Sequence, residues 1–120
     1  MVQVIFIAYV LLVIFVSLLP QPAGIGGGNL DKIVHASLYF VMGVLAYIAF
    51  NTLGKRIVMF VFMLLLGVSL ELFQEYIPGR DASVYDALAN TVGLALSFFL
   101  CWLYTIIPDV RPPGADNISR

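Results

Sequence analysis

Four long apolar runs constrain the fold of this chain more than any other feature of its sequence. A helix needs roughly 20 residues to cross the hydrocarbon core of a bilayer, whereas the strands of a membrane barrel alternate polar and apolar positions over about 10 residues. The runs in this chain are continuous and close to the helical length, so they predict helices and not strands. They cover residues 2–19, 33–53, 57–77 and 85–107. We therefore expect an all-α fold, a polytopic membrane bundle of four transmembrane helices.

The composition agrees with a membrane environment. Of the 120 residues, 62% are hydrophobic and 11% are charged, whereas a soluble domain averages roughly 45–50% apolar and 25% charged residues. A small domain has too much surface for its volume to hide that many apolar side chains from water, so we expect membrane lipids as partners. The net charge of −1 provides no basic surface for nucleic acid, and we expect no nucleic-acid partner.

The two ends of the chain differ from the runs between them. Residues 1–3 contain no Lys or Arg, whereas a secretory signal peptide normally starts with a basic segment, so we expect the first run to stay as a helix. Residues 109–120 contain Pro112-Pro113-Gly114 and few apolar side chains, a composition typical of disorder. We therefore divide the chain into a four-helix transmembrane domain, 1–108, and a flexible polar tail, 109–120.

The distribution of Lys and Arg predicts the orientation. Short loops that are rich in Lys and Arg stay on the cytoplasmic side. The side that holds both termini has four such residues and the other side has two, namely Lys55, Arg56, Arg111 and Arg120 against Lys32 and Arg80. We expect a multi-pass protein of the inner (cytoplasmic) membrane with both termini in the cytoplasm.

Polar side chains interrupt three of the four runs, all near the face that this orientation places outside. Residues four apart on a helix share one side, and the rise of 1.5 Å per residue puts Glu71 and Asn90 ~9–10 Å and His35 ~6 Å inside their helix ends. The polar residues are Asp31 and Lys32 just before the second run, His35 and Tyr39 within it, Glu71 and Gln74 in the third, and Asp86 and Asn90 in the fourth, with Arg80 and Ser83 in the loop before the fourth. Their similar depth predicts one shared site.

The acidic members of this set need partners. A charge at the centre of a bilayer costs about 2.5–3.5 kcal/mol on insertion scales, and ionisable residues at depth usually face the bundle interior with a partner. We expect Glu71 and Asp86 to face inward and to be linked to His35, Arg80 and Asn90. The candidate catalytic residues are Glu71, His35 and Asp86, and the candidate ligand-binding residues are Asp31, Lys32, Tyr39, Gln74, Arg80, Ser83 and Asn90.

Three polar motifs resemble a known family. They are Asp31-Lys32-x-x-His35-x-x-x-Tyr39, Glu71-x-x-Gln74, and Pro78-Gly79-Arg80-x-x-Ser83-x-x-Asp86-x-x-x-Asn90-x-x-Gly93. Together they resemble the pattern of VanZ-like membrane proteins, in family order and spacing, over roughly residues 17–97. The resemblance implies a small bacterial envelope protein related to one that is associated with low-level teicoplanin resistance.

The sequence does not single out a cofactor, an oligomeric state or a metal. A zinc site usually has more than one His or Cys among its ligands, and His35 is the only histidine. We therefore predict no metal ligands, although one histidine with carboxylates leaves Mg²⁺ or Ca²⁺ as an alternative.

Three functions stay open. The first is recognition of an anionic lipid-linked headgroup, such as a cell-wall precursor, with Arg80, Lys32 and His35 as donors. The second is a membrane-embedded enzyme that acts on a lipid-linked substrate, with Glu71 or His35 as general acid or base. The third is a small transporter or channel subunit, which would need polar residues along the whole path.

Overall fold

The computed structural model describes residues 1–21 and 28–107, and within these ranges the chain forms four helices and no strand. The expected all-α fold is confirmed. The helices are α1 (Val2–Ser17), α2 (Asn29–Ala49), α3 (Leu53–Gln74) and α4 (Val84–Ile106). The predicted tail, 109–120, lies outside the described residues.

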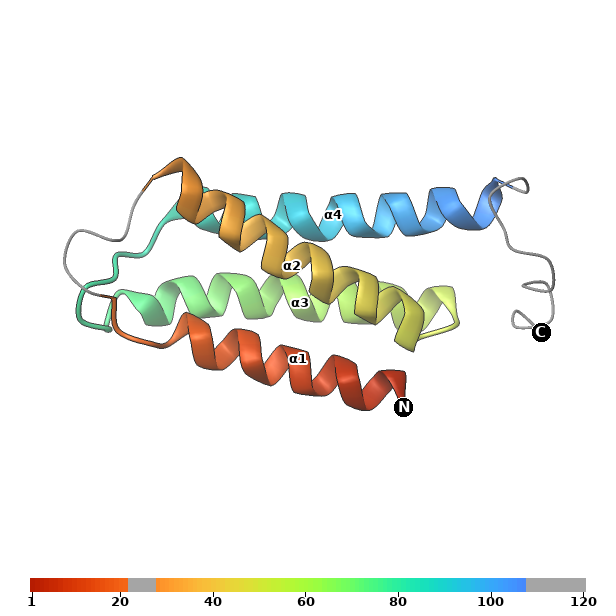
Figure 1. Cartoon of the computed structure of the whole chain (residues 1–120), viewed down its shortest axis with the longest axis horizontal. Coiled ribbons are helices and arrows are strands. Elements are labelled where there is room, and N and C mark those ends of the chain that lie inside the picture. The colour runs from red at the N-terminus through yellow and green to blue at the C-terminus, as the bar shows by residue number, and fades with distance from the viewer. Residues whose placement is uncertain (22–27, 108–120) are drawn as a thin grey trace.

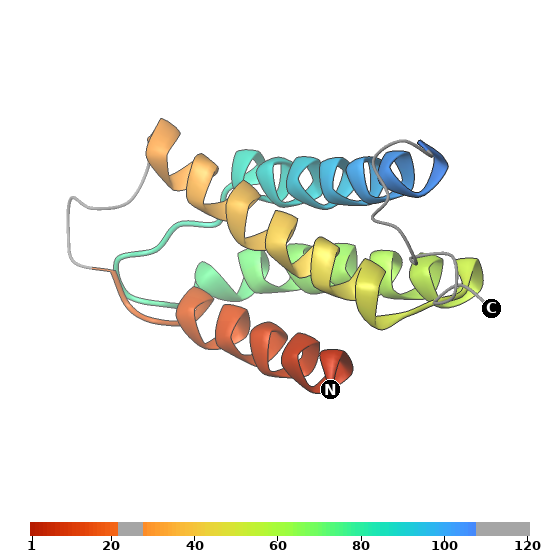
Figure 2. The ribbon, with the colours of Figure 1, turned by 45° about the vertical axis from the view of Figure 1, so that its right-hand side comes forward.

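The helices form a bundle in which neighbours along the chain alternate in direction (Figures 1 and 2). One end of the bundle therefore gathers the last turns of α1 and α3 and the first turns of α2 and α4, on the left in Figure 1. We call this end the polar end. The N-terminus and the connection between α2 and α3 lie at the other end.

Three of the helices are long and apolar enough to cross a membrane: α2, α3 and α4. The first helix is apolar as well, but it ends at Ser17 and has 16 residues, fewer than the run 2–19 predicted. Apolar side chains on all four helices face outward, Leu11, Val34, Leu65 and Leu88 among them. Lipid is the solvent that suits such a surface.

The connection between α2 and α3 comprises residues 50–52, whereas the gap between the predicted apolar runs, which was expected to be the turn, comprises residues 54–56. Gly54, Lys55 and Arg56 were expected to form a turn, but they belong to the first turn of α3. Thr52 caps this helix, since its side chain accepts a hydrogen bond from the Lys55 amide at 3.4 Å. Hydropathy misplaces such a boundary, because the polar first turn of a helix is as hydrophilic as a loop.

The closest packing in the bundle is between α2 and α4, because small residues let their backbones approach. Gly93 lies against the backbone carbonyl of Ala36, and Gly43 lies against the side chain of Ser97. A methyl group at either glycine would collide with these atoms. The contact fixes the polar first turns of α2 and α4 side by side.

The buried core lies between the polar end and the opposite end, and its larger members are apolar. It joins α1 to the other three helices through Phe6, Val10, Val13, Tyr39, Met42, Ala46, Met63 and Leu94. The buried carboxylates, Glu71 and Asp86, and the buried His35 lie outside this apolar core, at the polar end.

Candidate functional site

His35 is the residue around which the polar side chains gather. It lies on α2, is 8% exposed, and contacts both α3 and α4. Its Nδ1 atom lies 3.1 Å from Oδ1 of Asn90 and 3.5 Å from Oε1 of Glu71. Its Nε2 atom lies 3.9 Å from Oδ1 of Asp31, one turn earlier on α2. The side chain therefore links three helices at the polar end.

Glu71 joins α3 to the start of α4. It is buried, and its second carboxylate oxygen, Oε2, accepts a hydrogen bond from the Ser83 amide at 3.4 Å. The Ser83 hydroxyl in turn accepts a hydrogen bond from the Asp86 amide at 3.3 Å, which caps α4. Ser83 thus positions the first turn of α4 against Glu71.

Asp86 and Lys32 form the outer part of the site. The Lys32 ammonium lies 3.9 Å from Oδ1 of Asp86 and 5.9 Å from the centre of the Tyr85 ring. The Lys32 side chain is 37% exposed, whereas that of Asp86 is 9% exposed. Oδ1 of Asp86 has no hydrogen-bond partner among the residues that the structure describes.

These residues form one group, which we call the polar cluster: Asp31, Lys32, His35, Glu71, Asp86 and Asn90. It contains three carboxylates, one ammonium group and one imidazole. Carboxylates in a membrane interior need a cation or a proton nearby. With three carboxylates against one ammonium group, the polar cluster is acidic in its interior, and Lys32 is the cation at its outer edge.

Two of the predicted ligand-binding residues lie beside α1. The Gln74 amide donates a hydrogen bond to the Ser17 carbonyl at 2.9 Å. Arg80 donates to the carbonyl oxygens of Leu19 at 2.7 Å and Val16 at 3.2 Å. The last carbonyls of a helix lack partners within it, and these two side chains supply donors. Arg80 thus contacts the end of α1, and the expected link from Arg80 to the carboxylates is not among the contacts of the described residues.

Tyr39 lies one turn deeper than His35 and is buried. Its ring packs against α3 at Gly67, where a methyl group would come within 3.1 Å of the ring. Its hydroxyl has no hydrogen-bond partner within residues 1–21 and 28–107. The sequence did not indicate a role for Gly67, which provides the space for this ring.

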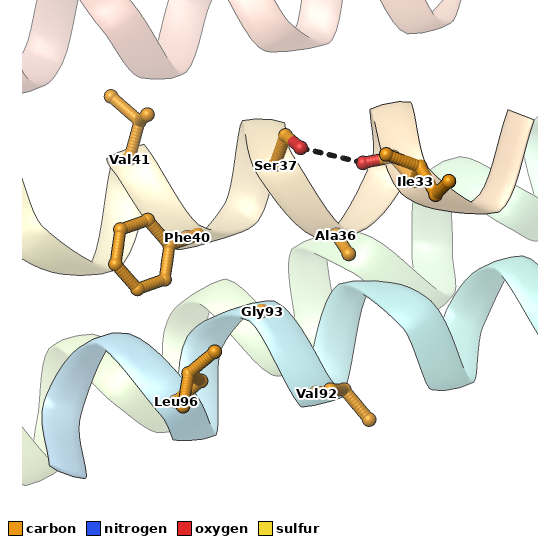
Figure 3. A pocket seen from close by; sticks show the side chains of 8 residues that line it. All are labelled: Ile33, Ala36, Ser37, Phe40, Val41, Val92, Gly93 and Leu96. Atoms are coloured by element: carbon orange, nitrogen blue, oxygen red, sulfur yellow. Dashed lines mark hydrogen bonds between the residues drawn. The ribbon is translucent and has the colours of Figure 1, made fainter. Parts of the chain in front are cut away.

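An apolar groove of about 300 Å³ runs along the seam between α2 and α4 (Figure 3). It is lined by Ile33, Ala36, Ser37, Phe40, Val41, Val92, Gly93 and Leu96. The Ser37 hydroxyl donates to the Ile33 carbonyl at 2.7 Å, so the wall offers little free hydrogen-bonding capacity. The sequence gives no sign of this groove, because a groove depends on how two helices cross.

The groove and the polar cluster are continuous along the two helices. Ala36, which lines the groove, lies four residues after Lys32 on α2, and Gly93 lies seven residues after Asp86 on α4, so each pair shares one side of its helix. Because both helices start at the polar end, the groove lies directly below the cluster, deeper in the bundle.

Comparison with known proteins gave one match. The model of a family described as VanZ/LLP1 matches residues 6–106, which include every member of the polar cluster and of the groove. No curated protein matches the chain, and no solved structure does.

Proposed function

Because this chain belongs to the VanZ/LLP1 family, we propose that it is a multi-pass protein of the bacterial cytoplasmic membrane that binds a lipid-linked, phosphate-bearing ligand of the cell wall. One observation carries this proposal. A polar cluster and an apolar groove adjoin on the same pair of helices, α2 and α4. A lipid-linked ligand has the same two parts, a polar head and an apolar chain.

The polar head would lie at the cluster. Lys32 is the accessible cation there, since its side chain is partly exposed. Its ammonium group suits a phosphate as a compact point charge. The buried carboxylates next to Lys32 would repel an anion, so the anionic head would stay at the outer edge of the cluster.

The apolar chain would lie in the groove. Its lining side chains are almost all apolar, and it extends deeper along α2 and α4 than Lys32 and Asp86, the outer members of the polar cluster. Apolar pockets with a few polar groups at one end are the usual form of small-molecule sites.

We place the polar end of the bundle at the outer face of the membrane. Lys55 and Arg56 lie at the opposite end, where Arg56 donates to the carbonyls of Tyr47 and Phe50 at 3.2 and 2.8 Å. Lys and Arg in short connections favour the cytoplasmic side, so both termini would be cytoplasmic. Arg111 and Arg120 lie outside the described residues.

An outward-facing site for a cell-wall precursor also supports a link to teicoplanin-type resistance. A precursor that is held at this site would be withheld from a glycopeptide antibiotic that targets it. Expression of the chain in a sensitive bacterium should then raise the teicoplanin concentration that inhibits growth.

The direct test is binding of a lipid-linked peptidoglycan precursor to the detergent-purified protein, measured by native mass spectrometry. Val92→Phe, which fills the groove, should weaken binding at least tenfold. Val58→Phe on α3 is the matched control, because Val92 and Val58 are 61% and 60% exposed and only Val92 lines the groove. No binding by the parent protein, or equal binding by the two variants, would overturn the proposal.

A membrane-embedded enzyme is the second candidate, favoured by the 3.5 Å contact between Glu71 and His35. Such a pair can pass a proton to or from a substrate. Incubation with the same precursor would then yield a product that Glu71→Gln fails to form. The transporter alternative gains less support, because the large buried side chains beyond the cluster are apolar.

A further inference from the structure

We propose that Asp31, His35 and Asp86 hold a divalent cation at the outer edge of the polar cluster. Each of these residues offers one ligand atom, and the three atoms all lie within 4.8 Å of one another. Asp31 and His35 come from successive turns of α2, and Asp86 comes from the first turn of α4. The tight packing of α2 on α4 therefore brings the three together. This inference departs from the sequence analysis, which predicted no metal ligands.

The contacts of His35 fit a metal ligand. The Asn90 carbonyl oxygen accepts a hydrogen bond from Nδ1 of His35 at 3.1 Å, an arrangement that leaves Nε2 as the ring nitrogen available to a metal. Nε2 faces the Asp31 carboxylate at 3.9 Å. Two acceptors that face each other repel unless a cation or a proton lies between them. A histidine that binds a metal through one nitrogen usually donates its other N–H to a carbonyl or carboxylate, as His35 does here.

Asp86 supplies an independent observation. Its side chain is 9% exposed, and its Oδ1 atom lacks a hydrogen-bond partner in the described part of the chain. The nearest cation, the Lys32 ammonium, is 3.9 Å away, which is beyond hydrogen-bond distance. A buried carboxylate oxygen without a hydrogen bond is costly, and a bound cation would remove that cost.

The spacing indicates which cations fit. The three ligand atoms lie within 4.8 Å of one another, and two ligands at that limit on opposite sides of a cation would have bonds of about 2.4 Å, within the range for Ca²⁺; smaller cations would need the side chains to lie closer together. Carboxylates suit Mg²⁺, Ca²⁺ and Mn²⁺, and imidazole suits transition metals. A mixed set of two carboxylates and one imidazole therefore favours a cation such as Mn²⁺.

Three protein ligands leave coordination positions free. A phosphate oxygen could take one of them, and the cation would then hold an anionic headgroup against an acidic cluster. This bridging role rests on the proposed function, whereas the cation site itself does not. Lys32, whose side chain is partly exposed, would turn away from Asp86 when the cation binds.

The test uses Mn²⁺ alone with the full-length, detergent-purified protein after chelation, and electron paramagnetic resonance measures free Mn²⁺. We expect one bound Mn²⁺ per chain, competition by Ca²⁺ or Zn²⁺, and at least tenfold weaker binding by Asp31→Asn and Asp86→Asn. Asp81→Asn is the matched control, since Asp81 is exposed in the loop before α4, and it should bind like the parent. Thermal unfolding without metal shows that each variant is folded.

Absence of Mn²⁺ binding by the folded parent would overturn the inference, and so would equal binding by Asp86→Asn and Asp81→Asn. Precursor binding with and without chelator separates the two proposals. If Mn²⁺ binds and the precursor does not, the proposed function fails and the cation site stands. If the precursor binds equally well after chelation and Mn²⁺ does not bind, the cation site is ruled out and the proposed function stands.

Discussion

The Nδ1 atom of His35 lies 3.1 Å from the side-chain oxygen of Asn90 across the seam between α2 and α4. Both residues are buried, and this contact ties the deep part of the polar cluster to the closest helix pair. It is held in place by the backbone approach one turn below, where Gly93 meets the Ala36 carbonyl. The cluster and the helix packing are therefore expected to respond together to substitution.

Asn90→Leu should destabilise the protein, because it removes the acceptor for His35 and leaves a buried imidazole N–H short of a partner. The cost of a buried group that loses its hydrogen bond is about 1–3 kcal/mol. Denaturant unfolding in detergent measures it. Thr91→Val is the control, since the Thr91 hydroxyl bonds only within α4, to the Ala87 carbonyl at 2.9 Å. Equal stability of the two variants would show that the His35–Asn90 contact contributes little.

Gly93→Ala should also lower stability, because its methyl group would collide with the backbone of Ala36. Overpacking of a close interface typically costs about 1–3 kcal/mol. Gly54→Ala is the matched control, since an added methyl group there meets nothing within 4 Å, and alanine favours a helix. The prediction fails if both variants unfold at the same denaturant concentration.

Arg80→Ala should loosen the attachment of α1. The substitution removes hydrogen bonds to the Leu19 and Val16 carbonyls, and bonds from a charged donor contribute about 1.5–3 kcal/mol each. Limited proteolysis between α1 and α2 should become faster, and Arg80→Lys should restore part of the protection. Weaker precursor binding with unchanged proteolysis would instead place Arg80 at the ligand.

Tyr39→Phe should leave stability nearly unchanged or raise it. The Tyr39 hydroxyl is buried and has no hydrogen-bond partner among the described residues, and an unsatisfied buried hydroxyl costs about 1–3 kcal/mol on mutational scales. Thermal unfolding of the two proteins compares them directly. A clear loss of stability would mean that the hydroxyl has a partner in the folded protein.

The number and type of the helices followed from the sequence, because long apolar runs are a local property and the bilayer sets their length. Helix limits were less predictable. The polar first turn of α3 was expected to be a turn between helices, and α1 proved shorter than its apolar run. Hydropathy cannot detect a cap such as Thr52, whose effect depends on a single hydrogen bond.

The sequence alone determined that Asp31, His35, Glu71, Asp86 and Asn90 lie at similar depths, because helical rise and spacing are fixed by the backbone. Only the tertiary structure decided their partners. Arg80, which the sequence grouped with the carboxylates, contacts the end of α1. The groove between α2 and α4 depends on how closely these helices approach at Gly93. Such contacts join residues far apart in the chain, so no local pattern specifies them.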